Sequence, residues 1–115
     1  MKEEMLELLA RMARIREFEL MAEKIFFSGE IQGFVHLYRG EEATATGICA
    51  ALRNDDYVTS THRGHGHLIA KGADVNAMLA ELCGKATGCN GGKGGAMRSA
   101  DIYRGILGAN GLLAA

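Results

Sequence analysis

Proline and tryptophan are absent from this sequence, and cysteine occurs only three times. Without proline and a strict three-residue repeat, the abundant glycine cannot indicate a collagen helix. The cysteines are Cys49, Cys83 and Cys89, an odd number at wide and irregular spacings. This spacing predicts neither a disulfide framework nor a zinc knuckle, so we expect reduced and mostly buried thiols.

An excess of one charge is also lacking, because 13 Lys and Arg residues balance 14 Asp and Glu residues. Proteins that bind nucleic acids neutralise phosphates with a clear excess of basic residues, so we expect no nucleic-acid partner. No apolar run reaches the roughly 18 residues that span a bilayer. The first residues, with Lys2, Glu3 and Glu4, do not resemble a signal peptide, and we expect a cytoplasmic protein without a membrane partner.

The chain has 115 residues, of which 48% are hydrophobic, and this composition is typical of one globular domain. Glycine is abundant, with 16 residues, about twice the usual fraction. Six of these glycines lie between Gly84 and Gly95, and three more follow at positions 105, 108 and 111. This distribution indicates backbone that closely approaches another group.

Hydrophobic spacing predicts a long amphipathic helix over about residues 3–27, ended by Ser28-Gly29. Its apolar positions recur in steps of three and four: Met5, Leu8, Met12, Ile15, Phe18, Ala22 and Ile25. Such a helix is about 37 Å long, which suggests that it packs against more protein than this chain supplies. The chain also ends in an apolar stretch over residues 111–115, so we expect a truncated sequence.

A second helix is predicted from Glu41-Glu42 to about Arg53, with both carboxylates at its positive end. One of its faces carries only small residues, and we expect this helix to lie in the interior: Ala43, Gly47, Ala50 and Ala51. A strand over residues 57–61 follows the turn at residues 54–56.

Two shorter helices are predicted next, one ending near Lys71 and one capped by Asp74 that runs to about Cys83. Alternation of helices, strand and glycine-rich loops predicts the α/β class, rich in helices, with one short parallel strand. Because one strand cannot form a sheet, the sequence leaves open whether the chain folds alone.

Chemistry-bearing residues gather directly after the predicted strand, in the segment His62-Arg63-Gly64-His65-Gly66-His67. Ligands of open α/β sheets bind at this place. The imidazoles and the planar guanidinium of Arg63 favour an anionic ligand such as a diphosphate. A zinc site on His65 and His67, completed by His62 or His36, is an alternative, and purely structural histidines are another.

The stretch from Gly88 to Gly95 fails the known nucleotide-loop patterns. For a P-loop, Thr87 stands where the first glycine belongs and Gly94 follows Lys93 in place of Ser or Thr. The dinucleotide-binding pattern G-x-G-x-x-G also fails, because Gly64-x-Gly66 leads to Ile69 in place of the third glycine. The sequence therefore argues against ATP and NAD, and a mobile surface loop is the simplest interpretation of the stretch.

Taken in order, four motifs resemble one known family, the alpha subunits of thiamine-diphosphate-dependent 2-oxo acid dehydrogenases. His62 stands where pyruvate-type enzymes usually carry tyrosine, which makes the chain most similar to the acetoin dehydrogenase branch. The resemblance runs from Arg11 to Leu113, on these motifs: Gly33-Phe34-Val35-His36-Leu37-Tyr38-x-Gly40-Glu41-Glu42-Ala43, Thr61-His62-Arg63-Gly64-His65-Gly66, Gly92-Lys93-Gly94-Gly95-Ala96-Met97 and Gly108-Ala109-Asn110-Gly111.

The resemblance implies roles for individual residues of this chain. His62 and Arg63 match the pair that contacts the cofactor diphosphate, while His36 and His65 match histidines close to the reacting centre. Gly111 and Leu113 match positions whose backbone holds the aminopyrimidine ring. Residues 93–95 match a loop at the edge of the site.

The sequence also departs from the family pattern. Ala96 and Arg98 flank Met97 where the family usually has Ser and His, which argues against a proton-transfer role for this loop. The G-D-G motif and the asparagine that hold Mg²⁺ on the diphosphate would lie beyond Ala115, so no metal ligand is expected here. Residues 1–115 thus resemble the N-terminal third of a thiamine-diphosphate-binding subunit.

The resemblance implies an oxidoreductase that cleaves acetoin or decarboxylates a 2-oxo acid and passes the acyl group to lipoamide. Its expected partners are a beta subunit, in a heterotetramer, and a lipoyl-bearing acyltransferase core. The beta subunit supplies the glutamate that activates the cofactor, so we expect the isolated chain to be inactive. A non-catalytic subunit-interaction module and a zinc hydrolase are the alternatives.

Overall fold

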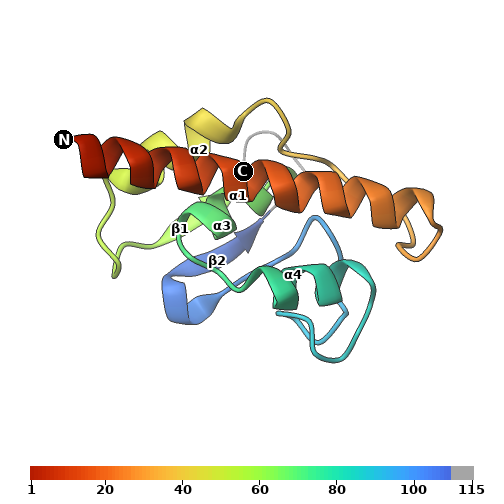
Figure 1. The fold of residues 1–115 in the computed structure, drawn as a ribbon. Helices are drawn as coiled ribbons and strands as arrows, with labels where there is room; N and C mark the ends of the chain where they lie inside the picture. Colours follow the sequence, from red (N-terminus) through yellow and green to blue (C-terminus); the bar gives the residue numbers. More distant parts are fainter. Residues whose placement is uncertain (110–115) are drawn as a thin grey trace.

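The computed structural model describes residues 1–109. It is rich in helices and contains a small parallel sheet, consistent with the predicted α/β class (Figure 1). In chain order the elements are α1 (Lys2–Phe27), α2 (Glu42–Ala50), β1 (Val58–Ser60), α3 (His65–Ala70), α4 (Val75–Leu82), the 3₁₀ turn η1 (Ile102–Arg104) and β2 (Ile106–Ala109). Gly111 and Leu113, two predicted cofactor-binding residues, lie outside the described residues.

Helix α1 confirms the predicted long helix and crosses the whole length of the molecule (Figure 1). Gly29 follows it with a φ of 84°, the left-handed conformation that ends a helix. Its buried side includes Ile15, Phe18 and Ala22. Met5, however, is 66% exposed, so the predicted buried face is wrong at the N-terminal end, which extends past the other elements.

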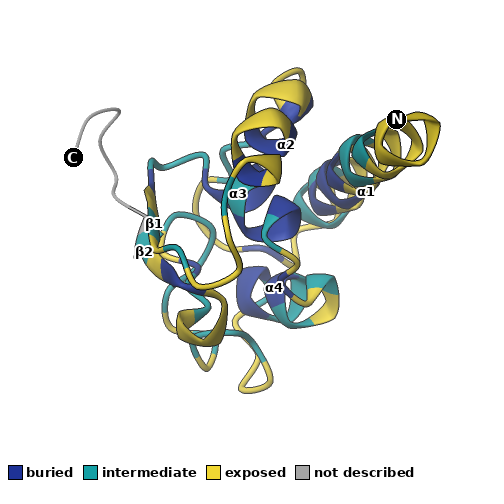
Figure 2. Ribbon diagram, turned by 90° about the vertical axis from the view of Figure 1, so that its left-hand side faces the viewer, coloured by how far each residue is buried: buried dark blue, intermediate teal, exposed yellow. Residues whose placement is uncertain are grey.

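Helix α2 ends at Ala50, before the predicted end at Arg53. The expectation that it lies in the interior is wrong, because its small-residue face, including Ala43 and Gly47, is exposed. The helix contacts α1 and α3 through its other side, where Ala45 and Thr46 are buried. Figure 2 shows the outer side of α2 as exposed.

The predicted strand is confirmed as β1, but the expectation of a lone strand is wrong. Strand β2 pairs with β1 in parallel, with Ile106 opposite Val58 and Gly108 opposite Thr59. Glycine lowers strand propensity, which explains why the sequence pattern gave no sign of β2. A left-handed turn at Gly105 leads into this strand, where an added Cβ would overlap the carbonyl oxygen of Asp56.

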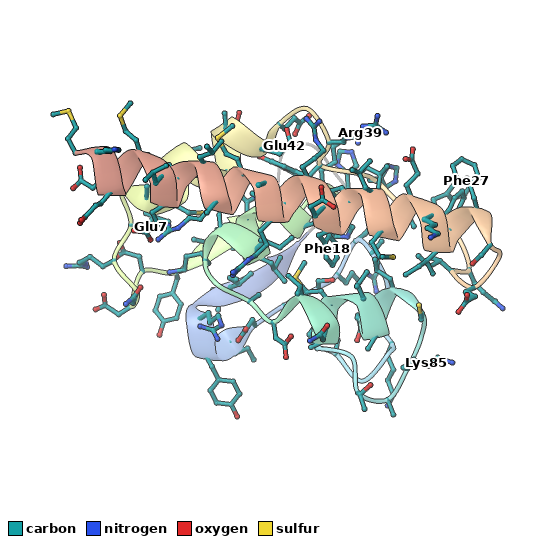
Figure 3. All side chains as sticks on the ribbon, in the orientation of Figure 1. Glu7, Phe18, Phe27, Arg39, Glu42 and Lys85 are labelled. Atoms are coloured by element: carbon teal, nitrogen blue, oxygen red, sulfur yellow. The ribbon has the colours of Figure 1, made fainter. Side chains whose placement is uncertain are left out.

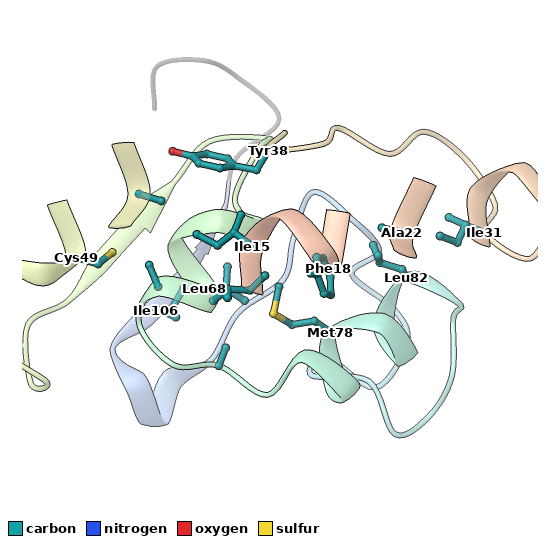
Figure 4. Close-up of a cluster of buried hydrophobic side chains, with 14 residues drawn as sticks. Ile15, Phe18, Ala22, Ile31, Tyr38, Cys49, Leu68, Met78, Leu82 and Ile106 are labelled. Carbon is teal, nitrogen blue, oxygen red and sulfur yellow. The ribbon is translucent and has the colours of Figure 1, made fainter. Parts of the chain in front are cut away.

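The core joins α1, α3, α4 and β2 (Figure 4). Ile15, Leu68, Met78 and Ile106 are each at most 1% exposed and come from these four elements. Phe18 extends the same cluster toward α4, as Figures 3 and 4 show. The core therefore fixes α3, and with it the histidine-rich segment, against α1.

One shorter prediction, the cap of α4, is confirmed, and the prediction of mostly buried thiols holds only for Cys49. The carboxylate of Asp74 accepts a hydrogen bond from the backbone N–H of Asn76 at 2.8 Å and so caps α4. Cys49 is buried, whereas Cys83 and Cys89 are half-buried, and all three thiols are free. No helix among residues 1–109 combines the length and the apolar character needed to cross a bilayer.

Candidate functional site

His36 and His62 lie against each other although 25 residues separate them in the chain. Their ring centroids are 4.8 Å apart, and the rings meet edge to face at 80°. His36 belongs to the loop between α1 and α2, and His62 follows β1 directly. The fold thus brings together two of the predicted site residues.

Arg63 ties the two segments together. Its Nη1 donates a hydrogen bond to the carbonyl oxygen of Leu37 at 2.6 Å, next to His36. Its backbone N–H donates to the Thr61 hydroxyl at 3.3 Å. The guanidinium has five N–H donors, so this contact with Leu37 leaves donors for a further acceptor.

The group is electropositive. Burial lowers the pKa of His36, and electrostatic interactions with His62, Arg63 and His65 lower it further. Both effects disfavour the charged imidazolium. At pH 7 His36 is therefore mainly neutral and can accept a proton or a hydrogen bond.

His65, the second predicted catalytic residue, is almost completely buried at the start of α3. Its Nδ1 lies 2.8 Å from Oε1 of Glu19 on α1, and the two side chains are 1% and 0% exposed. The ring of Phe18 packs edge to face against the imidazole at a centroid distance of 5.3 Å. The pair fixes the orientation of His65.

Glu19 was not among the residues predicted from the sequence. Its position, four residues after Ile15 and three before Ala22, places it on the buried side of α1. A carboxylate inside an otherwise apolar helical stripe is the signal that could have found it, because buried charges are normally paired.

Two ring nitrogens in this group are sealed from solvent without a partner among residues 1–109: Nδ1 of His62 and Nε2 of His65. Buried polar atoms are nearly always hydrogen-bonded, so such atoms indicate a place for a polar group that the described residues do not supply. With the free N–H donors of Arg63, Nδ1 of His62 fits an anionic, oxygen-rich ligand.

His67 faces a different part of the molecule. Its Nδ1 lies 2.7 Å from the hydroxyl of Ser60, and its ring packs against Tyr38. Burial lowers the pKa of His67. Within the described residues, no three His, Cys, Asp or Glu side chains come together as metal ligands would, and His65 and His67 use their Nδ1 atoms for separate partners.

The glycine-rich stretch is held in place, contrary to the expectation of a mobile surface loop. Four of its backbone N–H groups donate to the carboxylate of Glu81 on α4, which is 0% exposed. Burial alone would raise the pKa of Glu81, but the N–H groups of the loop outweigh burial and lower it. The sequence analysis did not single out Glu81.

Pockets among residues 1–109 lie elsewhere in the molecule, and two of them have a volume of about 390 Å³ or more. One of about 480 Å³ has Glu30, Gln32 and Lys93 at its edge, beside the glycine-rich loop. The other, about 390 Å³, lies against α1, α2 and α3 and includes Arg14 and Lys71. Neither pocket is lined by the histidine and arginine group described above.

Sequence comparison with known proteins identifies one family model and several curated relatives. The model of a family described as "Dehydrogenase E1 component" matches residues 10–115. The chain is 54% identical over 112 residues to the alpha subunit of acetoin:2,6-dichlorophenolindophenol oxidoreductase from Bacillus subtilis, covering 97% of this chain and 34% of that protein. Identity to the protein of the same name from Cupriavidus necator is 51% over 114 residues, covering 99% of this chain and 34% of that protein.

A chloroplastic pyruvate dehydrogenase E1 component subunit alpha-3 from Arabidopsis thaliana is 44% identical over 107 residues. That match covers 93% of this chain and 25% of the plant protein. The chain therefore spans about a third or less of the length of these curated relatives.

Proposed function

This chain belongs to the dehydrogenase E1 component family, and on that premise we propose that residues 1–115 are the N-terminal portion of a thiamine-diphosphate-binding domain. The whole protein is then the alpha subunit of a thiamine-diphosphate-dependent dehydrogenase. The observation that carries the proposal is that His36, His62, Arg63 and His65 lie near one another, with Nδ1 of His62 buried and without a partner among residues 1–109.

The proposed substrate is acetoin, with pyruvate or another 2-oxo acid as the alternative. The two relatives named for acetoin are 54% and 51% identical to this chain, against 44% for the plant subunit named for pyruvate. His62 supports the same choice, since pyruvate-type enzymes usually carry tyrosine at this position. In the proposed reaction the acyl group passes to lipoamide.

The residues present fit the cofactor's diphosphate. Arg63 keeps guanidinium donors beyond the one bonded to Leu37, and the sealed Nδ1 of His62 offers a further polar contact. A guanidinium and imidazoles satisfy phosphate oxygens through directed hydrogen bonds. We propose that His62 and Arg63 hold the diphosphate, with the Mg²⁺ ligands beyond residue 115.

When bound, thiamine diphosphate supplies a nucleophilic carbon and an electron sink for breaking a bond next to a carbonyl group. The residues of this chain would bind and orient the cofactor and would hold or accept protons. His36, neutral at pH 7, can accept a proton near the reacting atoms. His65, oriented by Glu19, presents its Nε2 as a second polar group, and the backbone at Gly111 and Leu113 is proposed to hold the aminopyrimidine.

The proposed partners are a beta subunit and a lipoyl-bearing acyltransferase core. Exposed apolar side chains on the outer side of α1, with Leu9 at 60% and Phe27 at 79% exposure, support a subunit interface there. Figure 3 shows Phe27 near the end of α1, away from the core residue Phe18.

The test uses the alpha subunit that carries this segment, assembled with its beta subunit. We expect the assembled protein to reduce 2,6-dichlorophenolindophenol with acetoin as the substrate. In Arg63→Ala we expect the affinity for thiamine diphosphate to be about 10- to 100-fold weaker, because one or two charge-assisted hydrogen bonds are lost. Arg39→Ala is the matched control, because Arg39 pairs with Glu23 at the surface. Unchanged cofactor affinity in Arg63→Ala would refute the assignment.

The isolated chain of 115 residues gives a second test. We expect no turnover and only weak binding of thiamine diphosphate with Mg²⁺, because the proposed metal ligands and the beta subunit are missing. Calorimetric titration measures this directly. Micromolar affinity of the isolated chain would show that residues 1–115 hold the cofactor without those groups.

A further inference from the structure

Glu81 is a buried carboxylate whose hydrogen-bond partners are all backbone N–H groups of one loop. Oε2 accepts from Asn90 and Gly92, both at 2.8 Å. Oε1 accepts from Gly94 at 2.6 Å and from Gly95 at 3.2 Å. No Lys, Arg or His side chain forms a salt bridge with Glu81 in the described part of the chain, so these four donors alone compensate its burial.

The loop can surround this carboxylate because its close contacts occur at glycines. An added Cβ at Gly88 would overlap the Glu81 backbone, and one at Gly92 would overlap the backbone of Gly84 and Lys85. Gly92 also has a φ of 76°, which side-chain-bearing residues rarely adopt. Successive N–H groups that converge on one point form an anion-binding concavity, and here a side chain of the same protein fills it.

The arrangement also holds the backbone at Lys93. Lys93 lies between Gly92 and Gly94, whose N–H groups bind different oxygens of the carboxylate. Its backbone is thereby held from both sides, and it lines the pocket of about 480 Å³ together with Glu30 and Gln32. The carboxylate of Glu81 therefore determines where the backbone of Lys93 lies at the pocket.

We propose that Glu81 is the positioning residue of the glycine-rich loop: its carboxylate is a built-in anion that shapes residues 90–95 and sets Lys93 at the pocket. The requirement is for two acceptor oxygens, each taking two N–H donors. A residue needed only for helix α4 or for filling space would not show this requirement. The inference does not depend on the proposed cofactor or reaction.

Hydrogen exchange of individual amides in the full chain, followed by NMR, tests this proposal. Glu81→Gln keeps the shape of the side chain but turns one acceptor oxygen into an NH₂ group that faces two N–H donors. We expect one pair of amides, either 90 and 92 or 94 and 95, to lose protection about tenfold or more, as for a lost hydrogen bond. The amides of Met78 in α4 and of Cys83 directly after it report whether the helix is intact.

Glu81→Ala extends the test through chemical rescue. We expect all four loop amides to lose protection, and added sodium acetate, but not sodium chloride at equal ionic strength, to restore it. Glu30→Gln is the control, because Glu30 lines the same pocket without bonding the loop. Full protection of the four amides in Glu81→Gln, or no difference between acetate and chloride in a folded Glu81→Ala protein, would overturn the proposal. If Glu81→Ala does not fold, Glu81→Gln decides alone.

Discussion

Arg16 and Glu42 join the middle of α1 to the first residue of α2: Nε of Arg16 donates to Oε1 of Glu42 at 2.5 Å. The Glu42 side chain is 7% exposed and that of Arg16 is 46% exposed. The other oxygen of Glu42 accepts the backbone N–H of Gly40 at 3.0 Å. One carboxylate therefore holds the turn before α2 and connects α2 to α1.

This relationship predicts a loss of stability in acid. The hydrogen bond from Arg16, with the N–H of Gly40 also contributing, lowers the pKa of Glu42 from 4.5 to about 2. A carboxyl group whose pKa is lower in the folded state stabilises fully above the unfolded value, and this contribution disappears as the pH falls from about 4.5 to about 2. Urea unfolding between pH 7 and pH 2 measures it.

Glu42→Gln removes the titrating group and is the variant for this comparison. We expect it to be less stable than the original chain at pH 7, with the difference shrinking toward pH 2. Asp55→Asn, at a largely exposed carboxylate, serves as the control. A difference between Glu42→Gln and the original chain that does not change with pH would contradict the prediction.

Two glycines in helices predict opposite effects of the same substitution. A Cβ at Gly66 in α3 would overlap the ring of Tyr38, which is 3% exposed. We expect Gly66→Ala to cost about 1–3 kcal/mol of unfolding free energy, as overpacking does. Gly47 in α2 has no atom within 4 Å of an added Cβ, so Gly47→Ala should stabilise by about 0.5–1 kcal/mol. Thermal unfolding of both variants tests the pair, and equal effects would refute this account.

The buried pair of Glu19 and His65 predicts a large effect of removing the carboxylate. Glu19→Ala leaves both ring nitrogens of His65 buried without a partner among residues 1–109, at a cost of about 1–3 kcal/mol. Glu17→Ala, at an exposed position of the same helix, should change stability by less than about 0.5 kcal/mol. Denaturant unfolding compares the two variants, and similar midpoints would show that the pair contributes nothing to stability.

The same pair predicts a spectroscopic signature. The carboxylate form of Glu19 can only accept, so we expect Nδ1 of His65 to carry the proton of this hydrogen bond. We expect ¹⁵N NMR of the imidazole to show a protonated Nδ1, and Glu19→Ala to abolish this preference. An unprotonated Nδ1 in the original chain would show that Glu19 donates to His65 and would refute this assignment of the proton.

Much of the fold was predictable because it depends on local signals. Helix α1, the left-handed Gly29 and the cap at Asp74 follow from spacing and from residue types. Strand β2 was missed because its pairing with β1 bridges 45 residues between Ser60 and Ile106 and its sequence includes a glycine. The exposed face of α2 was misread because small residues suit close packing but do not require it.

The candidate site was likewise predictable only in part. His36, His62, Arg63 and His65 were identified from motifs, and the roles assigned to them stay predictions. Glu19 and Glu81 were missed because their partners are distant in sequence: His65 follows Glu19 by 46 positions, and the loop amides follow Glu81 by 9 to 14 positions. A sequence motif identifies the residues that belong to it. Buried carboxylates that hold the motif in place are identified only from the three-dimensional structure.

The cysteines predict an order of chemical reactivity. Cys49 is 5% exposed, and burial raises the pKa of its thiol, which disfavours the reactive thiolate. Cys83, at the end of α4, is half-buried and therefore more accessible. We expect iodoacetamide at pH 8 to label Cys83 well before Cys49 in the folded chain, and urea to remove the difference. Mass spectrometry of peptides over time measures both rates. Equal labelling of the two thiols without urea would mean that the contact of α2 with α3, where Cys49 lies against the carbonyl of His67, opens readily in solution.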